Sequence, residues 1–196
     1  MDLKFVKVQE EHLEKIRLWR MSEDVTMYLY TDPQISQEGQ KKWYQQIIQD
    51  PLRMDWVVNV DGIDVGVIYL YDINPLHRRC FWAYYLAGES VRGKGIGGVI
   101  ELNLLNYAFE HCKLHKLCCE VFEWNHTVVK IHQKCGFKIE GVLREHIWKR
   151  GTYHNVVSMG ILRQDWEQEV KVKFSYYPTV EVEEWEDKKI ILRHLL

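Results

Sequence analysis

Hydrophobic and polar residues follow one another in patterns that divide most of the chain into short strands and helices. Alternating or continuous apolar runs with many β-branched and aromatic residues are typical of strands, and apolar residues three or four positions apart are typical of helices. The expected strands cover residues 3–8, 56–60, 65–71, 80–86, 117–122, 138–148 and 154–162. The expected helices cover residues 10–20, 36–50, 99–112 and 125–135.

The order of these elements predicts the fold class. Two strongly apolar strands, 80–86 and 117–122, are each followed by a helix, and hairpins stand on both sides of them. This order predicts a mixed α/β domain. The length of 196 residues fits one domain of residues 1–166 with a C-terminal extension of residues 167–196. Residues 171–185 alternate like an added pair of strands, which makes a homodimer contact through the extension an expectation.

Composition and charge exclude several classes of protein. With 46% hydrophobic and 28% charged residues, the chain is typical of a globular domain rather than of a disordered one. No apolar run approaches the roughly 18 residues that a membrane-spanning helix needs, and no apolar signal segment follows Met1. With a net charge of −2, the chain lacks the positive electrostatic potential that non-specific nucleic-acid binding requires. We therefore expect a cytoplasmic protein without a nucleic-acid or membrane partner.

The five cysteines indicate reduced thiols. Their number is odd, and no two of them form a Cys-x-x-Cys pair. Cys118 and Cys119 are adjacent in an expected strand, so their side chains point to opposite faces and cannot pair. A cytosolic protein without a disulfide framework or a metal site is the better interpretation.

A glycine-rich segment carries the first candidate chemistry. It follows a strand, opens a helix and contains Arg92, Gly93, Lys94, Gly95, Ile96, Gly97 and Gly98. Backbone N–H groups of such a loop, together with the helix N-terminus, form an anion site for phosphate. A plain strand-to-helix turn that binds nothing is the alternative. The Walker A pattern, which is another phosphate-binding motif, is absent. Gly93-x-Gly95-x-x-Gly98 does match the dinucleotide-binding fingerprint. Against this alternative, a Rossmann domain needs several consecutive βαβ units.

Two motifs together give a more specific interpretation. Arg92-x-x-Gly95-x-Gly97 resembles the acyl-CoA pyrophosphate loop of the GCN5-related N-acetyltransferase (GNAT) superfamily. Downstream, Asn125 begins a helix whose pattern ends in Gly136-Phe137, and this resembles the second CoA-facing helix of the same family. The resemblance runs over roughly residues 3–165. It implies a mixed sheet whose two central strands splay apart, with acetyl-CoA between them as co-substrate.

The resemblance implies which residues bind the cofactor. The backbone N–H near Leu86 would meet the acetyl carbonyl as an oxyanion-type donor. Further cofactor contacts are expected from Ala87, Val91, the loop Arg92–Gly98, Asn125 and Lys134. In this family a neutral amine attacks the thioester directly, so the protein supplies no nucleophile and no metal.

Proton transfer is expected at two positions. Many family members have a tyrosine acid where this chain has His132, which could protonate the CoA thiolate because a histidine titrates near neutral pH. Glu120 matches a position that some relatives use for a base. The structural alternatives are that His132 only packs beside the cofactor sulfur and that Glu120 is satisfied by a neighbouring donor. His77 and Tyr84 are weaker candidates for proton transfer.

The amine acceptor is expected from the N-terminal third. The segments Trp19-Arg20 and Met27–Thr31 resemble the branch of the family that acetylates amino-sugar nucleotides for pseudaminic acid synthesis, at the 4-amino group of a UDP-linked sugar. Expected acceptor contacts are Trp19, Arg20, Tyr28, Tyr30 and Tyr84. Trp19 could equally be a core residue on its helix face. A polyamine, a ribosomal-protein N-terminus, and a non-catalytic CoA-binding role remain as alternatives.

Overall fold

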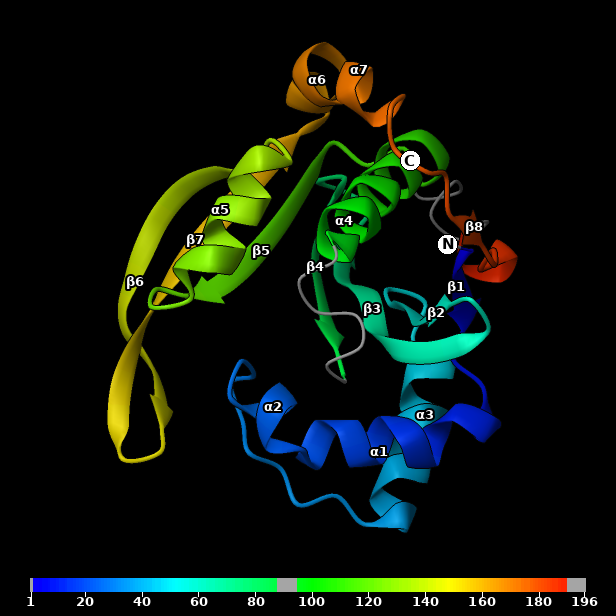
Figure 1. The fold of residues 1–196 in the computed structure, drawn as a ribbon, viewed down its shortest axis with the longest axis vertical. Coiled ribbons are helices and arrows are strands. Elements are labelled where there is room, and N and C mark those ends of the chain that lie inside the picture. The colour runs from blue at the N-terminus through cyan, green and yellow to red at the C-terminus, as the bar shows by residue number, and fades with distance from the viewer. Residues whose placement is uncertain (1, 88–94, 190–196) are drawn as a thin grey trace. The chain divides into compact units, whose positions relative to one another are not determined.

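The computed structural model describes residues 2–87 and 95–189, which form two compact units. Unit 1 comprises the described residues 2–73, 82–87 and 180–189. Unit 2 comprises residues 74–81 and 95–179. The strand β4 (Arg79–Leu86) contributes residues to both units, so each unit is described by itself (Figure 1).

The described strands form a mixed sheet, which confirms the predicted α/β class. Its eight strands follow the order β6-β7-β5-β4-β3-β2-β1-β8. In unit 1 these are β1 (Leu3–Lys7), β2 (Met54–Val60), β3 (Ile63–Asn74), most of β4, and β8 (Glu181–Val182). In unit 2 they are the first residues of β4, then β5 (Lys116–Phe122), β6 (Lys138–Lys149) and β7 (Thr152–Leu162). The strands β4 and β5 pair in parallel over Arg79–Phe81 and Lys116–Cys118.

Helices of unit 1 cover the core formed with strands β2, β3 and β4. They are the 3-10 turn η1 (Glu10–His12), α1 (Leu13–Met21), the short α2 (Glu23–Thr26), which the sequence analysis missed, and α3 (Gln37–Gln49). Ser36 begins α3, because its hydroxyl accepts a hydrogen bond from the N–H of Gly39 at 3.0 Å. The core cluster consists of Val8, Leu13, Ile16, Val25, Ile47, Val57, Val67, Tyr85 and Ala87.

Gly66 permits the close approach of two strand backbones at the end of β4. A Cβ atom at this position would lie 2.1 Å from the carbonyl oxygen of Tyr85. The N–H of Ala87 donates to the carbonyl oxygen of Val65 at 2.7 Å on the same side. Any larger residue at position 66 would therefore clash with the backbone at the end of β4.

Several described helices belong to unit 2. They are α4 (Ile96–Asn106), which continues into the π-helical turn η3 (Tyr107–His111), α5 (His126–Lys134), α6 (Arg163–Asp165), the π-helical turn η4 (Trp166–Val170) and α7 (Lys171–Phe174). Asn125 begins α5 and Gly136, with φ +96°, follows its end, as the sequence predicts. The strands β6 and β7 form a long hairpin that Figure 1 shows clearly.

The expected strand pair in residues 171–185 is wrong. Residues 163–174 are helical, and the one strand described in this stretch, β8, has two residues. Trp166 and Val170 are both buried in unit 2, and their spacing of four positions is the helical signal that the sequence analysis missed. The chain beyond them becomes extended at Pro178, whose missing N–H disfavours a central strand.

The end of the extension is anchored in unit 1. Strand β8 pairs in parallel with β1, and the Trp56 indole donates to the carbonyl oxygen of Glu183 at 2.8 Å. The buried Lys188 ammonium donates to the carbonyl oxygens of Ile47 at 2.8 Å and Arg53 at 2.6 Å. Because Ile47 lies in the last turn of α3, this cation is also favourably placed for the helix dipole.

Across the described residues, no helix is long and apolar enough to cross a membrane.

Candidate functional site

The N-terminus of α4 is the part of the glycine-rich loop that the structure describes. Gly95 is the N-cap with φ +74°, a left-handed conformation that favours glycine. Cβ atoms placed on Gly95 or Gly98 would meet no atom of the described residues within 4 Å. Ile96, Gly97 and Gly98 supply the first helical N–H groups, which lack partners within the helix. Val91, Arg92, Gly93 and Lys94 lie outside the described residues.

This geometry fits the pyrophosphate of a CoA-type ligand. A helix start with unpaired N–H groups attracts an anion, and glycines without side chains let the anion approach the backbone. The helix is 11 residues long and continues into η3, so its dipole is fully developed at Gly95. The residues that would hold the pyrophosphate in unit 2 are therefore Gly95–Gly98.

The end of β4 supplies a backbone donor in unit 1. Successive N–H groups of a strand point to opposite edges. Because the N–H of Ala87 is bonded to Val65 of β3, the N–H of Leu86 points to the edge away from β3. An oxyanion-type contact from Leu86 is consistent with this direction, whereas the N–H of Ala87 is already occupied.

Helix α5 places two expected cofactor residues in unit 2. The side-chain oxygen of Asn125 accepts a hydrogen bond from the N–H of Val128 at 3.4 Å and caps the helix. The cap uses the amide oxygen, so the NH2 group of Asn125 is the part suited to a ligand. Lys134 is exposed in the last turn of the same helix.

His132 lies on the buried face of α5 and contacts a carboxylate of α4. Its exposed fraction is 4%, and that of Glu101 is 0%. His132 Nδ1 lies 2.9 Å from Glu101 Oε2. The imidazole also packs against Phe137, with ring centroids 5.6 Å apart. Sequence reasoning selected His132 and missed Glu101, although an acidic residue in the apolar run Val99–Leu105 is a readable signal.

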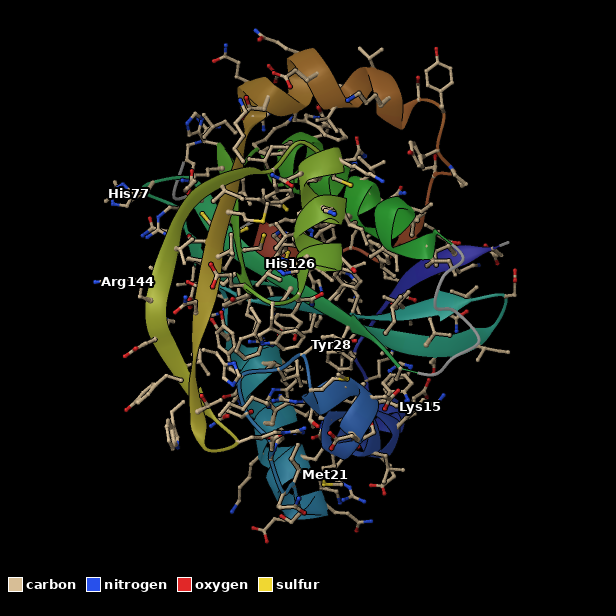
Figure 2. All side chains as sticks on the ribbon, turned by 60° about the vertical axis from the view of Figure 1, so that its left-hand side comes forward. Lys15, Met21, Tyr28, His77, His126 and Arg144 are labelled. Atoms are coloured by element: carbon tan, nitrogen blue, oxygen red, sulfur yellow. The ribbon has the colours of Figure 1, made fainter. Side chains whose placement is uncertain are left out.

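The other expected acid–base residues lie apart from this pair in the sequence and differ in exposure. Glu120 is half-buried in β5 and pairs in register with Ser158 of β7. His77 is exposed in the turn before β4, where its N–H donates to the Asn74 side chain at 2.8 Å (Figure 2). Tyr84 stacks on Trp82 in β4, with centroids 5.7 Å apart. Roles for these residues in proton transfer stay predictions.

The cysteine thiols are poorly suited to act as nucleophiles. All five are buried and free of disulfides. Burial raises the pKa of Cys119 well above its ordinary value, and it also raises the pKa of Cys118 and of Cys135. A thiol whose pKa is raised carries little thiolate at neutral pH, and the thiolate is the reactive form. This chemistry favours direct transfer over a covalent acyl-cysteine.

The expected acceptor residues of unit 1 occupy different environments. Trp19 is partly buried and packs against the core cluster, and Tyr28 is 46% exposed (Figure 2). Tyr30 is half-buried, and Tyr84 forms the stack with Trp82. Arg20, in contrast, lines a cavity. Their roles toward an acceptor stay predictions.

That cavity, of about 40 Å³, lies among the helices and strands of unit 1. The Arg20 Nε and the Tyr85 hydroxyl are both buried without a hydrogen-bond partner. Arg53 is satisfied differently, because it donates two hydrogen bonds of 2.8 Å to Asp55. The residues lining the cavity are Arg20, Leu29, Trp43, Arg53, Asp55, Val67, Tyr69 and Tyr85. Its volume suits one or two small polar atoms, such as water or the oxygen of a ligand.

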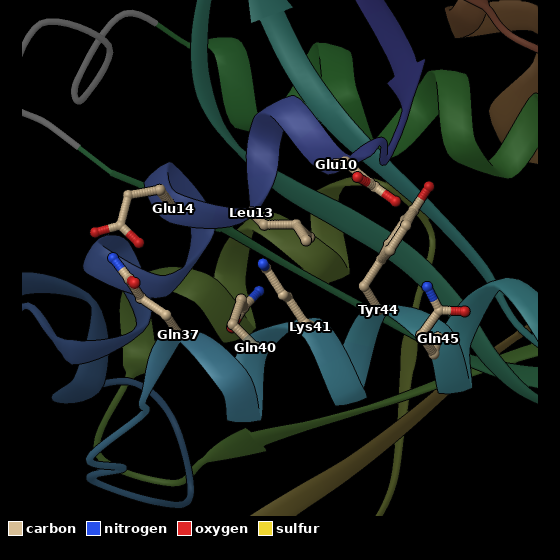
Figure 3. A pocket seen from close by; sticks show the side chains of 8 residues that line it. All are labelled: Glu10, Leu13, Glu14, Gln37, Gln40, Lys41, Tyr44 and Gln45. Carbon is tan, nitrogen blue, oxygen red and sulfur yellow. The ribbon is translucent and has the colours of Figure 1, made fainter.

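A larger hollow of about 420 Å³ lies between α3 and the segment of η1 and α1, as Figure 3 shows. None of the expected site residues lines it. Gln40 is 3% exposed there and its Nε2 has no partner, while the Glu14 carboxylate is held by Arg17 at 2.6 Å. The lining residues are Glu10, Leu13, Glu14, Gln37, Gln40, Lys41, Tyr44 and Gln45. The hollow is lined by both polar and apolar surface, and sequence reasoning did not find it.

Comparison with known families identifies the fold and the chemistry. The profile described as the acetyltransferase (GNAT) domain matches residues 2–138. The chain belongs to the GNAT acetyltransferase family. This result confirms the resemblance found in the glycine loop and the α5 motif, and it makes the protein an N-acetyltransferase.

Individual GNAT acetyltransferases resemble the chain over most of its length. Spermidine N(1)-acetyltransferase of Escherichia coli K12 is 27% identical, covering 86% of this chain and 90% of that protein. The acetyltransferase PseH of Campylobacter jejuni 81-176 is 26% identical, covering 69% and 82%. The crystal structure of spermidine N-acetyltransferase from Vibrio cholerae with CoA and spermine has a TM-score of 0.81 at 26% identity, covering 85% of this chain and 99% of that one.

Proposed function

We propose that this acetyltransferase moves the acetyl group of acetyl-CoA directly to a primary amine of a small molecule. The observation that carries the proposal is the glycine-rich N-terminus of α4, where Gly95 is the N-cap and the first helical N–H groups are suited to the pyrophosphate of CoA. The solved Vibrio cholerae spermidine N-acetyltransferase is a complex with CoA and spermine. The raised pKa values of the buried thiols argue against a covalent intermediate on cysteine.

Three groups of this chain take part in the proposed reaction. The N–H of Leu86 donates to the acetyl carbonyl oxygen as negative charge develops on it. Asn125 donates its amide NH2 to the cofactor. His132 transfers protons, because the attacking amine must lose a proton and the departing thiolate must gain one.

A polyamine is the first candidate acceptor. Relatives named spermidine N-acetyltransferase match this chain over a larger share of its length than the PseH proteins do. The expected preference for a UDP-linked amino sugar therefore takes second place on similarity alone.

A second copy of this chain stays a predicted partner.

A nucleotide-linked amino sugar is the second candidate, and the small cavity of unit 1 favours it. Arg20 Nε and the Tyr85 hydroxyl are buried donors without a partner, and no described residue forms an ion pair with Arg20. Such donors suit an anionic or oxygen-rich acceptor, whereas the positive charge of Arg20 would repel a polyamine.

Replacing Arg20 by methionine is expected to separate the two acceptor classes. Methionine fills similar volume and removes both the charge and the Nε donor. We expect the KM for a UDP-linked 4-amino sugar to rise about tenfold or more, since a charge-assisted hydrogen bond contributes about 1.5–3 kcal/mol. The KM for spermidine should stay the same or fall. Equal changes for both acceptors would contradict a specific role for Arg20, and steady-state kinetics with each acceptor measures the difference.

A panel of amines tests the proposed function. Release of the CoA thiol from acetyl-CoA is measured with spermidine, with a UDP-linked 4-amino sugar and with a peptide that begins with alanine. Turnover with one of them supports the proposal and names the acceptor class. Binding of CoA without turnover of any of the three would favour a non-catalytic CoA-binding role.

A further inference from the structure

Glu101 is a buried carboxylate in a helix that is otherwise largely apolar. It has no exposed surface, and it stands between Ile100 and Leu102, which are also buried. Moving a carboxylate out of water is costly unless a cation or a strong donor compensates it. Replacing a buried ionic pair by apolar residues of similar volume is often neutral or stabilising, so stability of α4 alone does not account for a glutamate here. Its position therefore needs another explanation.

The partner of Glu101 is the residue already expected to transfer protons. His132 Nδ1 lies 2.9 Å from Glu101 Oε2, and His132 is itself 96% buried, since only 4% of it is exposed. The Phe137 ring lies against the imidazole, with ring centroids 5.6 Å apart. A carboxylate can only accept, so Nδ1 carries the proton in this hydrogen bond.

This contact determines the tautomer of His132. With a proton fixed on Nδ1, the other ring nitrogen, Nε2, is the atom that gains and loses protons. The carboxylate also stabilises the ring when it becomes positively charged. The same logic relates histidine to aspartate in the serine-protease triad, where the carboxylate orients the imidazole without taking its proton.

We propose that Glu101 is a positioning residue that fixes His132 as the proton-transferring group of the acetyltransferase. The inference rests on the proposed function. As the amine nitrogen bonds to the acetyl carbon and the C–S bond breaks, protonated His132 gives its Nε2 proton to the CoA sulfur. The neutral ring then takes the proton that the new amide nitrogen must lose, so His132 ends in its starting state and no other reactant is needed.

The surroundings of the pair contain few other groups that could replace it. Cys119 of β5 and Cys135 at the end of α5 face the Glu101 charge, and their pKa values are raised, first by burial and then by that carboxylate. The positive charge of Lys173 in α7 has the opposite, smaller effect and lowers the pKa of Cys135. Both thiols are thus held neutral beside Glu101, which leaves His132 as the proton-transferring group at this carboxylate.

A double-mutant cycle in kcat tests the proposal. Glu101→Gln keeps the size and the hydrogen-bond acceptor but removes the charge, and it is expected to lower kcat at least about tenfold, with the KM for acetyl-CoA within about twofold. His132→Gln removes proton transfer. In the His132→Gln background, Glu101→Gln should change kcat less than twofold, because Glu101 acts through the ring.

Asn103→Leu is the matched control. Asn103 is a second buried polar residue of α4, 3% exposed, whose amide donates to Val99 and Pro178 carbonyls. This variant should lower the melting temperature without changing kcat. If Glu101→Gln behaves like Asn103→Leu, or if its effect on kcat is equally large in both backgrounds, Glu101 is structural and the proposal is wrong.

A spectroscopic readout makes the result independent of turnover. The 15N shifts of the His132 ring in the wild-type protein should report a protonated Nδ1, and Glu101→Gln should reduce this preference. A wild-type ring protonated only on Nε2 would overturn the proposal even if the enzyme is active. Absence of acetyl transfer by the wild type, with the Nδ1 proton present, would instead refute the proposed function and leave the pairing intact.

Discussion

Replacing His132 by glutamine is expected to lower kcat for acetyl transfer by about a hundredfold or more, because general acid–base catalysis typically contributes 10²–10⁴. Glutamine is chosen because its amide still donates to Glu101, which would otherwise remain buried without a partner. The KM for acetyl-CoA should change little, since the proposed cofactor contacts are other residues, such as Gly95–Gly98 and Asn125. Steady-state kinetics at saturating amine measures both values.

His132→Tyr is the companion variant, since the family resemblance gives a tyrosine at this position in many relatives. It should retain much more kcat than His132→Gln, provided that both variants keep the wild-type melting temperature within a few degrees. Equal kcat for the wild type and His132→Gln would show that His132 only packs in unit 2.

Replacing Gly95 by valine is expected to weaken acetyl-CoA binding by about a hundredfold or more. Valine disfavours the left-handed conformation of Gly95, at φ +74°, and its side chain would hinder the approach of an anion to the backbone at the start of α4. Two lost charge-assisted hydrogen bonds from N–H groups to the pyrophosphate, at about 1.5–3 kcal/mol each, are enough for this loss. Isothermal titration calorimetry with CoA measures the affinity directly.

Gly62→Val provides a control with the same backbone cost. Gly62 lies in the turn between β2 and β3 with φ +82°, and a Cβ there would also meet no atom within 4 Å. Both variants should lose similar stability, but only Gly95→Val should lose CoA binding. An unchanged affinity for CoA in Gly95→Val would show that the pyrophosphate does not bind at the start of α4.

Local patterns predict the fold where one signal dominates a segment. Asn125 and Gly136 mark the ends of α5, and Ser36 marks the start of α3 within one residue. The prediction of a strand pair in the extension was wrong because the alternation in residues 171–185 was given more weight than the helical spacing of Trp166 and Val170. The short β8 needs the edge of β1, a partner far away in the sequence. Such tertiary pairing leaves no local pattern.

The candidate site divides in the same way. The loop from Gly95 and the cap at Asn125 are sequence motifs, so they could be predicted without a structure. The sequence marks Glu101 as an acidic residue in an apolar run, but it does not show the residue that Glu101 contacts, and the same holds for the contact partner of Tyr85. Glu101 and His132 lie 31 positions apart in the sequence. Tyr85 and Arg20, which line the same cavity, lie 65 positions apart. Both contacts are therefore non-local.

The central claim is that this GNAT protein transfers acetyl groups from acetyl-CoA to an amine. Mass spectrometry of the amine after incubation with acetyl-CoA, with CoA thiol measured in the same sample, tests it most directly. The account predicts an acetylated amine and free CoA in equal amounts, with both reduced together in His132→Gln. CoA thiol that appears at the same rate without any amine, or an amine that stays unmodified while CoA binds, would contradict it.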